Sequence, residues 1–238
     1  KRVEHTLFEE QINANHPYQP FLANHVPSEF GSVLTSEQEN LYFRLTPPLS
    51  KTGKHPVIVY VYGGPGAQKV RKEWSPLLLQ LFAHNGFGVL ELDNRGSSNR
   101  GRGFEAPIYR AMGSVEVEDQ LRGVELLKSV PWADTNNIGI FGHSYGGYMT
   151  LMSLCSAPDV FKAGAAVAPV SDWALYDSHY TERYMGLPQE QPDAYRNSGV
   201  IAHLHQLESA LMLIHGMADD NVLFTHSTLI MACGDRRW

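Results

Sequence analysis

The sequence predicts an α/β fold built on a mostly parallel, doubly wound sheet, and three observations lead to that fold class. Short apolar runs recur along the chain, and stretches with a helical period lie between them. The runs are apolar almost without interruption, as burial on both faces of a sheet requires. A chain of 238 residues, 43% of them hydrophobic, can bury one sizeable core or at most two small ones.

The first part of the chain differs from the rest. Residues 1–28 mix charged residues, Asn, His and Pro without a steady period, apart from a short stretch over residues 4–12 that favours a helix. We interpret this segment as a connector. Apolar positions then alternate at residues 33–34 and across 41–45, around a polar turn at residues 36–40. This alternation predicts an antiparallel hairpin on the edge of the sheet.

Five apolar runs downstream predict the parallel strands. They are residues 57–62, 89–92, 138–141, 163–167 and 210–215. Helices are expected between them, one over residues 76–85 and one that begins after Ser114 and ends before Pro131. The Ser114 hydroxyl is expected to cap the second helix. That helix carries one apolar stripe, formed by Val117, Leu121, Val124 and Leu127.

Composition excludes several classes of protein. Asp and Glu number 25 against 19 Lys and Arg, a net charge of −6 with no basic stripe, which argues against nucleic acid as a partner. No apolar run approaches the roughly 20 residues of a membrane-spanning helix, so no membrane span is expected. Cys155 and Cys233 form no CxxC pair and are expected to be free, largely buried thiols. His203 and His205 lack a third ligand at a suitable spacing, so neither a metal nor a cofactor is expected.

A serine turn follows the predicted strand at residues 138–141. The motif is Gly142-His143-Ser144-Tyr145-Gly146-Gly147, and a helix-competent segment at residues 148–155 comes after it. A serine on such a turn is held in a strained conformation with Oγ exposed at the top of the sheet, and the flanking glycines leave room for the close approach. Ser144 is therefore the candidate nucleophile, and His143 is expected to pack beside the turn, because a base must reach Oγ from another loop. The alternative is a glycine-rich turn with an idle serine.

Such a nucleophile needs hydrogen-bond donors for the oxyanion and an acid that orients the base. The Tyr145 N–H is one candidate donor. The glycine turn after the strand at 57–62 is expected to supply the other, either as a backbone N–H or as the Tyr62 hydroxyl, unless Tyr62 only caps the strand. Asp219 follows Ser144 by 75 residues, in the order serine, acid, histidine that is typical of α/β-hydrolases. Asp220 is interpreted as a solvated or capping carboxylate.

Four stretches together carry a family resemblance. They are residues 61–68, 142–148, 170–187 and 214–222. The third stretch is the most specific, because it contains Asp172-Trp173, Tyr176-Asp177-Ser178 and the run from Tyr180 to Pro188. Over nearly its whole length the chain resembles the catalytic domain of the prolyl oligopeptidase family, in particular that of bacterial dipeptidyl peptidase IV-like serine peptidases.

The resemblance implies a role for each matching position. Ser144 would be the nucleophile, Asp219 the acid, and the Tyr62 hydroxyl with the Tyr145 N–H the oxyanion hole. Asn221 matches a position that holds a substrate carbonyl. The slot for the residue before the scissile bond would be lined by the Tyr145 ring, Val170, Trp173, Tyr176, Tyr180 and Val222. An aromatic box suits a proline ring, which is apolar, rigid and without an N–H, and the alternative is a Tyr/Trp cluster that only packs a helix. Arg95, in the matching run 93–97, is expected to tie loops together.

Two family features have no match in the sequence. Because the β-propeller domain that selects a free N-terminus is not found, residues 1–28 are interpreted as a connector from a missing propeller and residues 29–238 as a truncated catalytic domain. The family's catalytic histidine follows one further strand, whereas the chain ends 19 residues after Asp219. The general base, the last strand and the last helix are therefore expected beyond the chain end. His226 is expected on a different face from Asp219, and the tail 231–238 does not resemble the family's continuation.

The resemblance implies a serine exopeptidase that acts on peptides with proline or alanine at the second position and releases dipeptides by acyl transfer through Ser144. An acylaminoacyl-peptidase or esterase would share the serine turn without explaining the aromatic cluster. A non-catalytic remnant that lacks the histidine is the third reading. Homodimer formation and a periplasmic or secreted location are implied by the resemblance alone.

Overall fold

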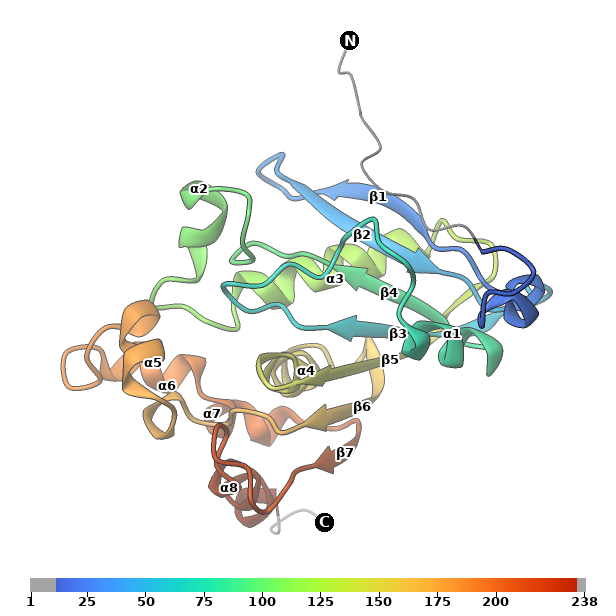
Figure 1. The fold of residues 1–238 in the computed structure, drawn as a ribbon. Helices are drawn as coiled ribbons and strands as arrows, with labels where there is room; N and C mark the ends of the chain where they lie inside the picture. The colour runs from blue at the N-terminus through green and yellow to red at the C-terminus, as the bar shows by residue number, and fades with distance from the viewer. Residues whose placement is uncertain (1–11, 235–238) are drawn as a thin grey trace.

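A seven-stranded sheet forms the centre of the computed structural model, which describes residues 12–234 (Figure 1). The strands are β1 (Glu29–Leu34), β2 (Asn40–Thr46), β3 (His55–Val61), β4 (Gly88–Leu92), β5 (Ala133–His143), β6 (Phe161–Val167) and β7 (Ala210–Ile214). Their order is β1-β2-β4-β3-β5-β6-β7. β1 and β2 form the antiparallel hairpin predicted for one edge, β2 pairs antiparallel with β4, and β3 to β7 are parallel to one another. All five predicted parallel strands are confirmed, and the architecture is that of an α/β-hydrolase.

Helices connect the parallel strands. The α-helices are α1 (Leu77–His84), α2 (Arg102–Glu105), α3 (Val115–Leu127), α4 (Tyr145–Ser156), α5 (Ser178–Met185), α6 (Pro192–Ser198), α7 (Val200–His203) and α8 (Thr225–Gly234). Short 3-10 helices are η1 (Gln19–Asn24), η2 (Ala106–Ile108), η3 (Trp173–Leu175) and η4 (Leu204–Gln206). None of the helices within residues 12–234 is long and apolar enough to cross a bilayer.

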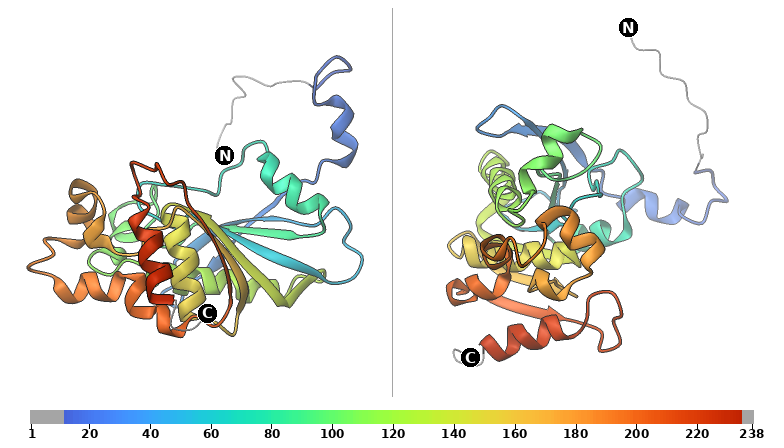
Figure 2. Two further views of the ribbon diagram at one scale, coloured as in Figure 1. Left: turned by 90° about the horizontal axis from the view of Figure 1, so that it is seen from below. Right: turned by 90° about the vertical axis from the view of Figure 1, so that its left-hand side faces the viewer.

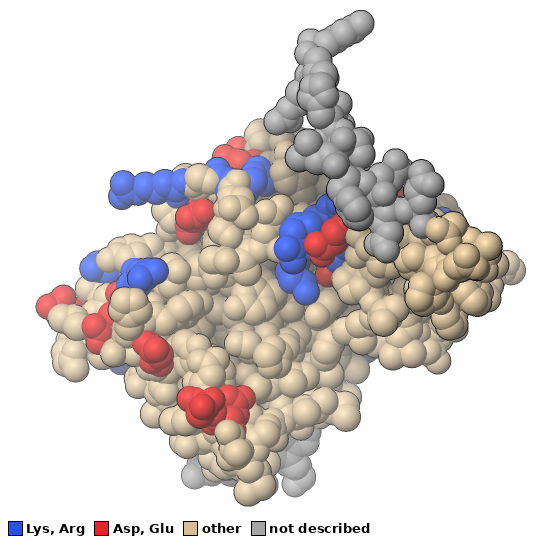
Figure 3. Space-filling model, viewed as in Figure 1, with Lys and Arg blue, Asp and Glu red and all other residues tan. Residues whose placement is uncertain are grey.

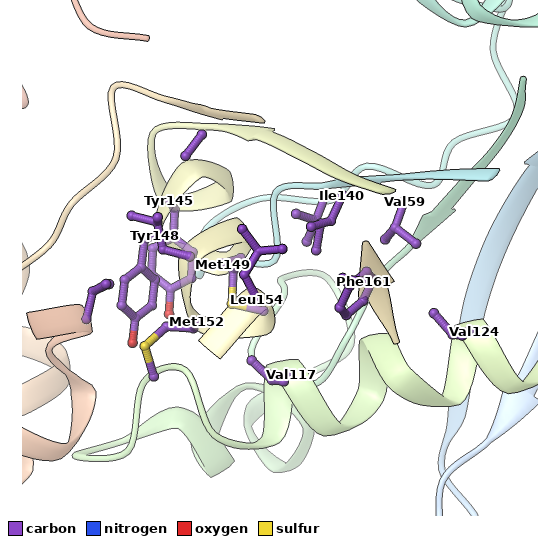
Figure 4. Close-up of a cluster of buried hydrophobic side chains, with 14 of the residues drawn as sticks. Val59, Val117, Val124, Ile140, Tyr145, Tyr148, Met149, Met152, Leu154 and Phe161 are labelled. Atoms are coloured by element: carbon purple, nitrogen blue, oxygen red, sulfur yellow. The ribbon is translucent and has the colours of Figure 1, made fainter. Parts of the chain in front are cut away.

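The core lies between the sheet and α4, with α3 beside it (Figure 4). Val57, Val59 and Val61 of β3 are buried on the same face as Ile138 and Ile140 of β5. Every residue of α4 up to Cys155 is buried, as expected of a helix packed on all sides. On the opposite face of the sheet, Phe82 of α1 contacts Phe141 edge-on, with ring centroids 6.2 Å apart. Successive residues of β5 thus face different helices, which confirms a doubly wound sheet.

Residues 1–28, interpreted from the sequence as a connector, are only partly described. The helix expected over residues 4–12 falls almost wholly on residues 1–11, outside the described part of the chain, and Ile12 itself is not helical. η1 was not predicted, because none of its residues is buried and no apolar period marks it. Figure 2 shows η1 beside α1. Val26, two residues after η1, exchanges two backbone-to-side-chain hydrogen bonds with Gln80 of α1.

Three local expectations were wrong. The Ser114 hydroxyl does not cap α3 but donates to the Ala111 carbonyl, and the Glu116 carboxylate accepts the N–H of Gly113, which lies before the helix. Cys233 is exposed, although Cys155 is buried and both thiols are free as expected. His143 is exposed rather than packed, because alternate side chains at the end of β5 point to solvent.

Arg95 ties loops together as predicted. Its guanidinium and its backbone N–H both donate to the Asp119 carboxylate of α3. A further ion pair reaches Glu37 in the β1–β2 hairpin at 3.3 Å. The cation therefore joins three segments that are distant in the sequence, and its buried charge is paired.

Candidate active site

The serine turn has the predicted geometry. Ser144 lies between β5 and α4 with φ 60° and ψ −119°, a backbone conformation that non-glycine residues rarely adopt. Its N–H donates to the Val167 carbonyl at 2.9 Å, and its carbonyl accepts the Tyr148 N–H at 3.0 Å. The residue is partly exposed. The strained serine after a central parallel strand and at the start of a helix is confirmed.

Two glycines of the motif are required by close backbone contacts. A Cβ added at Gly142 would lie 2.2 Å from the Gly146 carbonyl oxygen, and one added at Gly146 would lie 2.3 Å from the Val61 oxygen. Both clashes are with backbone atoms, which cannot rotate away. β5, the start of α4 and the end of β3 can pack this closely only because neither residue has a side chain.

The two candidate oxyanion donors lie on neighbouring elements. Tyr145 is the first residue of α4, so its N–H has no partner within the helix. Tyr62 follows the end of β3, and the two ring centroids are 6.1 Å apart. Burial raises the pKa of the Tyr62 phenol, and the nearby Tyr176 and Tyr184 raise it further. The Tyr62 hydroxyl therefore keeps its proton at neutral pH and can donate a hydrogen bond.

The predicted slot residues come together as a continuous aromatic cluster. Trp173 is fully buried, and its ring centroid lies 5.5 Å from Tyr145, 5.9 Å from Tyr176 and 6.2 Å from Tyr180. Tyr176 and Tyr180 contact each other edge-on at 5.4 Å. The predicted aliphatic residues Val170 and Val222 are both buried.

Sequence reasoning missed two members of this cluster. The Tyr184 ring lies 5.0 Å from Tyr180, and the Tyr148 ring lies 5.0 Å from Trp173. Helical spacing was the available signal, because Tyr184 is four residues after Tyr180 and Tyr148 is three after Tyr145.

Short-range caps shape the segment that carries the cluster. The Asp172 carboxylate accepts the Ala174 N–H at 2.9 Å and caps η3. The Asp177 carboxylate accepts the Tyr180 N–H at 3.1 Å and caps α5. Two of the acidic residues that carry the family resemblance therefore orient the aromatic side chains that follow them.

Asp219 lies on the loop after β7, at the edge of the sheet. Its Oδ1 accepts the N–H groups of Asn221 at 3.0 Å and Val222 at 2.9 Å. These hydrogen bonds lower the pKa of the carboxyl, and the nearby His215 and His143 lower it further. Asp219 is thus ionised at neutral pH. Asp220 beside it is exposed, as expected.

Asn221 connects this loop to the aromatic cluster. The Tyr176 hydroxyl donates to the Asn221 Oδ1 at 3.2 Å, across 45 residues of sequence. The residues predicted to hold two parts of one substrate therefore touch each other.

The histidines near Asp219 already have other partners. His215 donates from Nε2 to the Val222 carbonyl at 2.7 Å, and its Nδ1 bonds the Ser227 hydroxyl at 2.6 Å. His226 is fully buried, burial lowers the pKa of its ring, and its Nδ1 accepts the Ser171 N–H at 3.1 Å. Within residues 12–234 no histidine nitrogen is in hydrogen-bond contact with Ser144.

Charged side chains are scattered over the visible surface. On the face shown in Figure 3, basic and acidic groups lie in small separate groups with wide uncharged surface between them. No three His, Cys, Asp or Glu side chains among the described residues are grouped so that they could hold a metal ion. His203 and His205 each bond a backbone carbonyl instead, that of Asn197 and that of Ala202.

A strained serine at a strand-to-helix turn, with an ionised acid after a later parallel strand, defines the chain as an α/β-hydrolase. The chain belongs to the prolyl oligopeptidase family, whose sequence model matches residues 73–233.

Individual relatives agree with this assignment. The chain is 36% identical over 220 residues to dipeptidyl peptidase 8 of Homo sapiens and of Mus musculus, which covers 89% of this chain and 24% and 25% of those proteins. It is also similar to the crystal structure of Porphyromonas gingivalis dipeptidyl peptidase 4, with a TM-score of 0.87 and 34% identity over 94% of this chain and 33% of that one. The chain therefore spans about a quarter to a third of the length of these relatives.

Proposed function

We propose that this chain is the catalytic part of a serine dipeptidyl peptidase that cleaves after proline or alanine. The observation that carries the proposal is the aromatic cluster beside Ser144, since Tyr145 belongs to both the serine turn and the cluster. A slot lined by rings binds an apolar, rigid proline side chain well, and proline brings no N–H that would need a partner there. The named relatives are dipeptidyl peptidases, which supports the same reaction.

In the proposed mechanism the Ser144 Oγ attacks the carbonyl carbon of the second residue of the peptide, and a histidine held by Asp219 takes the hydroxyl proton. The Tyr62 hydroxyl and the Tyr145 N–H stabilise the negative oxygen of the tetrahedral intermediate. The same histidine then gives its proton to the leaving amine, and the acyl-serine is released by water. Asn221 binds the preceding carbonyl of the substrate. In residues 12–234 no histidine occupies the position that this mechanism needs.

Two measurements test the proposal. The first is binding of alanyl-pyrrolidide to the 238-residue chain by calorimetry, which probes the slot without needing a base. The second is hydrolysis of Gly-Pro and Gly-Leu anilides by a longer form of the protein that continues past Trp238, with Ser144→Ala as the blank. We expect measurable binding and a preference for Gly-Pro of about 10- to 200-fold, the range that side-chain fit in a pocket supplies. Equal rates on both anilides would show that the cluster does not select.

A specific observation favours one alternative, a non-catalytic member that keeps the slot. That observation is that no described histidine is hydrogen-bonded to Ser144. In this case alanyl-pyrrolidide binds, but an activated phosphonate labels Ser144 no faster than it labels other serines in either form of the protein.

A further inference from the structure

Glu116 is a buried carboxylate beside the serine turn that no part of the proposed mechanism uses. It lies in the first turn of α3 with no exposed surface. No Lys, Arg or His among the described residues forms an ion pair with it. Burial of a carboxylate without a cation costs folding free energy, so its hydrogen-bond partners must offset part of that cost.

Its partners belong to the site. The Glu116 Oε1 accepts the Gly113 N–H at 2.9 Å and the Tyr145 hydroxyl at 2.8 Å, and Oε2 is buried without a partner. The bond to Tyr145 joins α3 to the first residue of α4 across 29 residues of sequence.

Tyr145 contributes to both the slot and the candidate oxyanion hole, so a displacement of this residue would change both. Its ring lies between Tyr62 and Trp173, and Gly64 packs so closely on it that a Cβ there would lie 2.6 Å from the ring. Its N–H is the candidate oxyanion donor. Figure 4 shows the Tyr145 and Tyr148 rings together at the end of the core cluster far from Val124. The Tyr145 hydroxyl is held in place by its hydrogen bond to Glu116.

We propose that Glu116 is a positioning residue: its carboxylate holds the Tyr145 hydroxyl and thereby sets both the slot wall and the direction of the Tyr145 N–H. The inference rests on the proposed function, because it assigns Glu116 to the same slot. A buried hydrogen bond fixes the relative position of its two partners, and catalytic geometry tolerates displacements of well under 1 Å, so this one bond can control the affinity of the slot.

Asp119 provides a matched control. It is a buried carboxylate on the same helix, three residues further along, but its hydrogen bonds go to Arg95 and not to the aromatic cluster. Loss of Asp119 should lower stability and leave the slot unchanged, whereas a positioning residue should change the affinity of the slot.

The test is calorimetric binding of alanyl-pyrrolidide to the 238-residue chain and its variants, with near-ultraviolet circular dichroism as a ligand-free report on the rings around Trp173. We expect Glu116→Ala and Tyr145→Phe each to weaken binding by about 10-fold or more and to change the aromatic dichroism. Glu116→Gln, which keeps an acceptor, should stay within about threefold of the parent. The affinity of Asp119→Asn should stay within about twofold of that of the parent. The double variant Glu116→Ala/Tyr145→Phe should bind no more weakly than the single variant with the lower affinity, because the two groups act as one unit.

The outcomes separate the two proposals. If the parent binds and Tyr145→Phe binds equally well, the positioning role is wrong and the proposed function stands. If the parent does not bind, the slot proposal is wrong, and the dichroism of Tyr145→Phe and Glu116→Gln decides whether Glu116 holds the ring. If Glu116→Ala does not fold, Tyr145→Phe and Glu116→Gln carry the test, and a Glu116→Gln variant that binds as weakly as Tyr145→Phe, or a Tyr145→Phe variant that binds as well as the parent, would overturn the inference.

Discussion

The serine turn and the acid loop both follow parallel strands, but they are held in different ways. The serine turn lies in the middle of the sheet, where glycines allow backbone segments to touch and Ser144 is strained. The acid loop follows the edge strand β7, where Met212 and Ile214 are 62% and 41% exposed. Asp219 keeps its place there through two backbone N–H groups and is itself partly exposed. Central geometry is thus set by steric fit, and edge geometry by a few hydrogen bonds.

The difference predicts which part of the proposed catalytic unit is incomplete. The serine turn is formed in the described chain, whereas no described histidine completes the acid loop. The 238-residue chain should therefore turn over a Gly-Pro anilide about 10³-fold or more slowly than a form that continues past Trp238, because an incomplete triad keeps only the contributions of oxyanion hole and binding. Turnover within tenfold of the longer form would contradict this prediction and make His226 the candidate general base. Its change to Ala should then abolish activity.

Substitution of one glycine in each region tests the steric part of the comparison. Gly146→Ala places a Cβ against the Val61 carbonyl and should lower the free energy of unfolding by about 3 kcal/mol or prevent folding. A Cβ at Gly216, in the acid loop, meets nothing within 4 Å, so Gly216→Ala should change that free energy by no more than about 0.5 kcal/mol. Urea unfolding of both variants measures the difference, and similar losses in the two would show that the serine turn is not the tighter one.

One carboxyl group in each region, Glu116 beside the serine turn and Asp219 in the acid loop, should make stability depend on pH in opposite directions. Burial raises the pKa of Glu116 to about 7, and the phenols that face it, Tyr145, Tyr148 and Tyr180, have raised pKa values and stay protonated. A raised carboxyl pKa means that the folded chain binds the extra proton, so this group's contribution falls as the pH rises from about 4.5 to 7, by about 3 kcal/mol in total. The lowered pKa of Asp219 works the other way, with stability that is lost as the pH falls through its folded pKa.

Glu116→Gln isolates the first of these effects. Urea unfolding at pH 5 and pH 8 should show the parent losing stability relative to this variant as the pH rises. Parallel pH profiles for the two proteins would mean that Glu116 does not titrate in this range.

The smallest expected effect concerns the link between the regions. Tyr176→Phe removes the hydroxyl that bonds Asn221 and keeps the ring in the aromatic cluster. The bond is exposed, so the free energy of unfolding should change by less than about 1 kcal/mol. The KM for a Gly-Pro anilide should rise about fivefold, because Asn221 is no longer held toward the substrate. An unchanged KM would show that the acid loop does not need this contact.

Local patterns in the sequence were sufficient to predict most of the sheet and the serine turn. Continuous apolar runs marked β3 to β7, although only β4 is buried at every position and the edge strand β7 leaves Met212 and Ile214 exposed. Ser144 was found because the steric demands of its turn are met by glycines within two residues. The cap of α3 was mispredicted because a serine before a helix can also donate its hydroxyl to a preceding carbonyl, as Ser114 does to Ala111, and the sequence does not show which bond forms.

Contacts between distant segments were decided only by the tertiary structure. Two hydrogen bonds join distant residues: Tyr145 to Glu116, 29 positions apart, and Tyr176 to Asn221, 45 positions apart. No local period in the sequence predicts these bonds or the burial of Glu116. The pKa of Glu116 depends on burial and that of Asp219 on two N–H groups in a loop, and neither environment can be derived from the neighbouring residues. By itself the sequence determined which segments become strands and helices and where a strained serine must lie, because those features follow from short-range sterics and periodicity. The packing of α3 against α4 decided which polar groups meet inside the core, because that depends on the three-dimensional path of the whole chain.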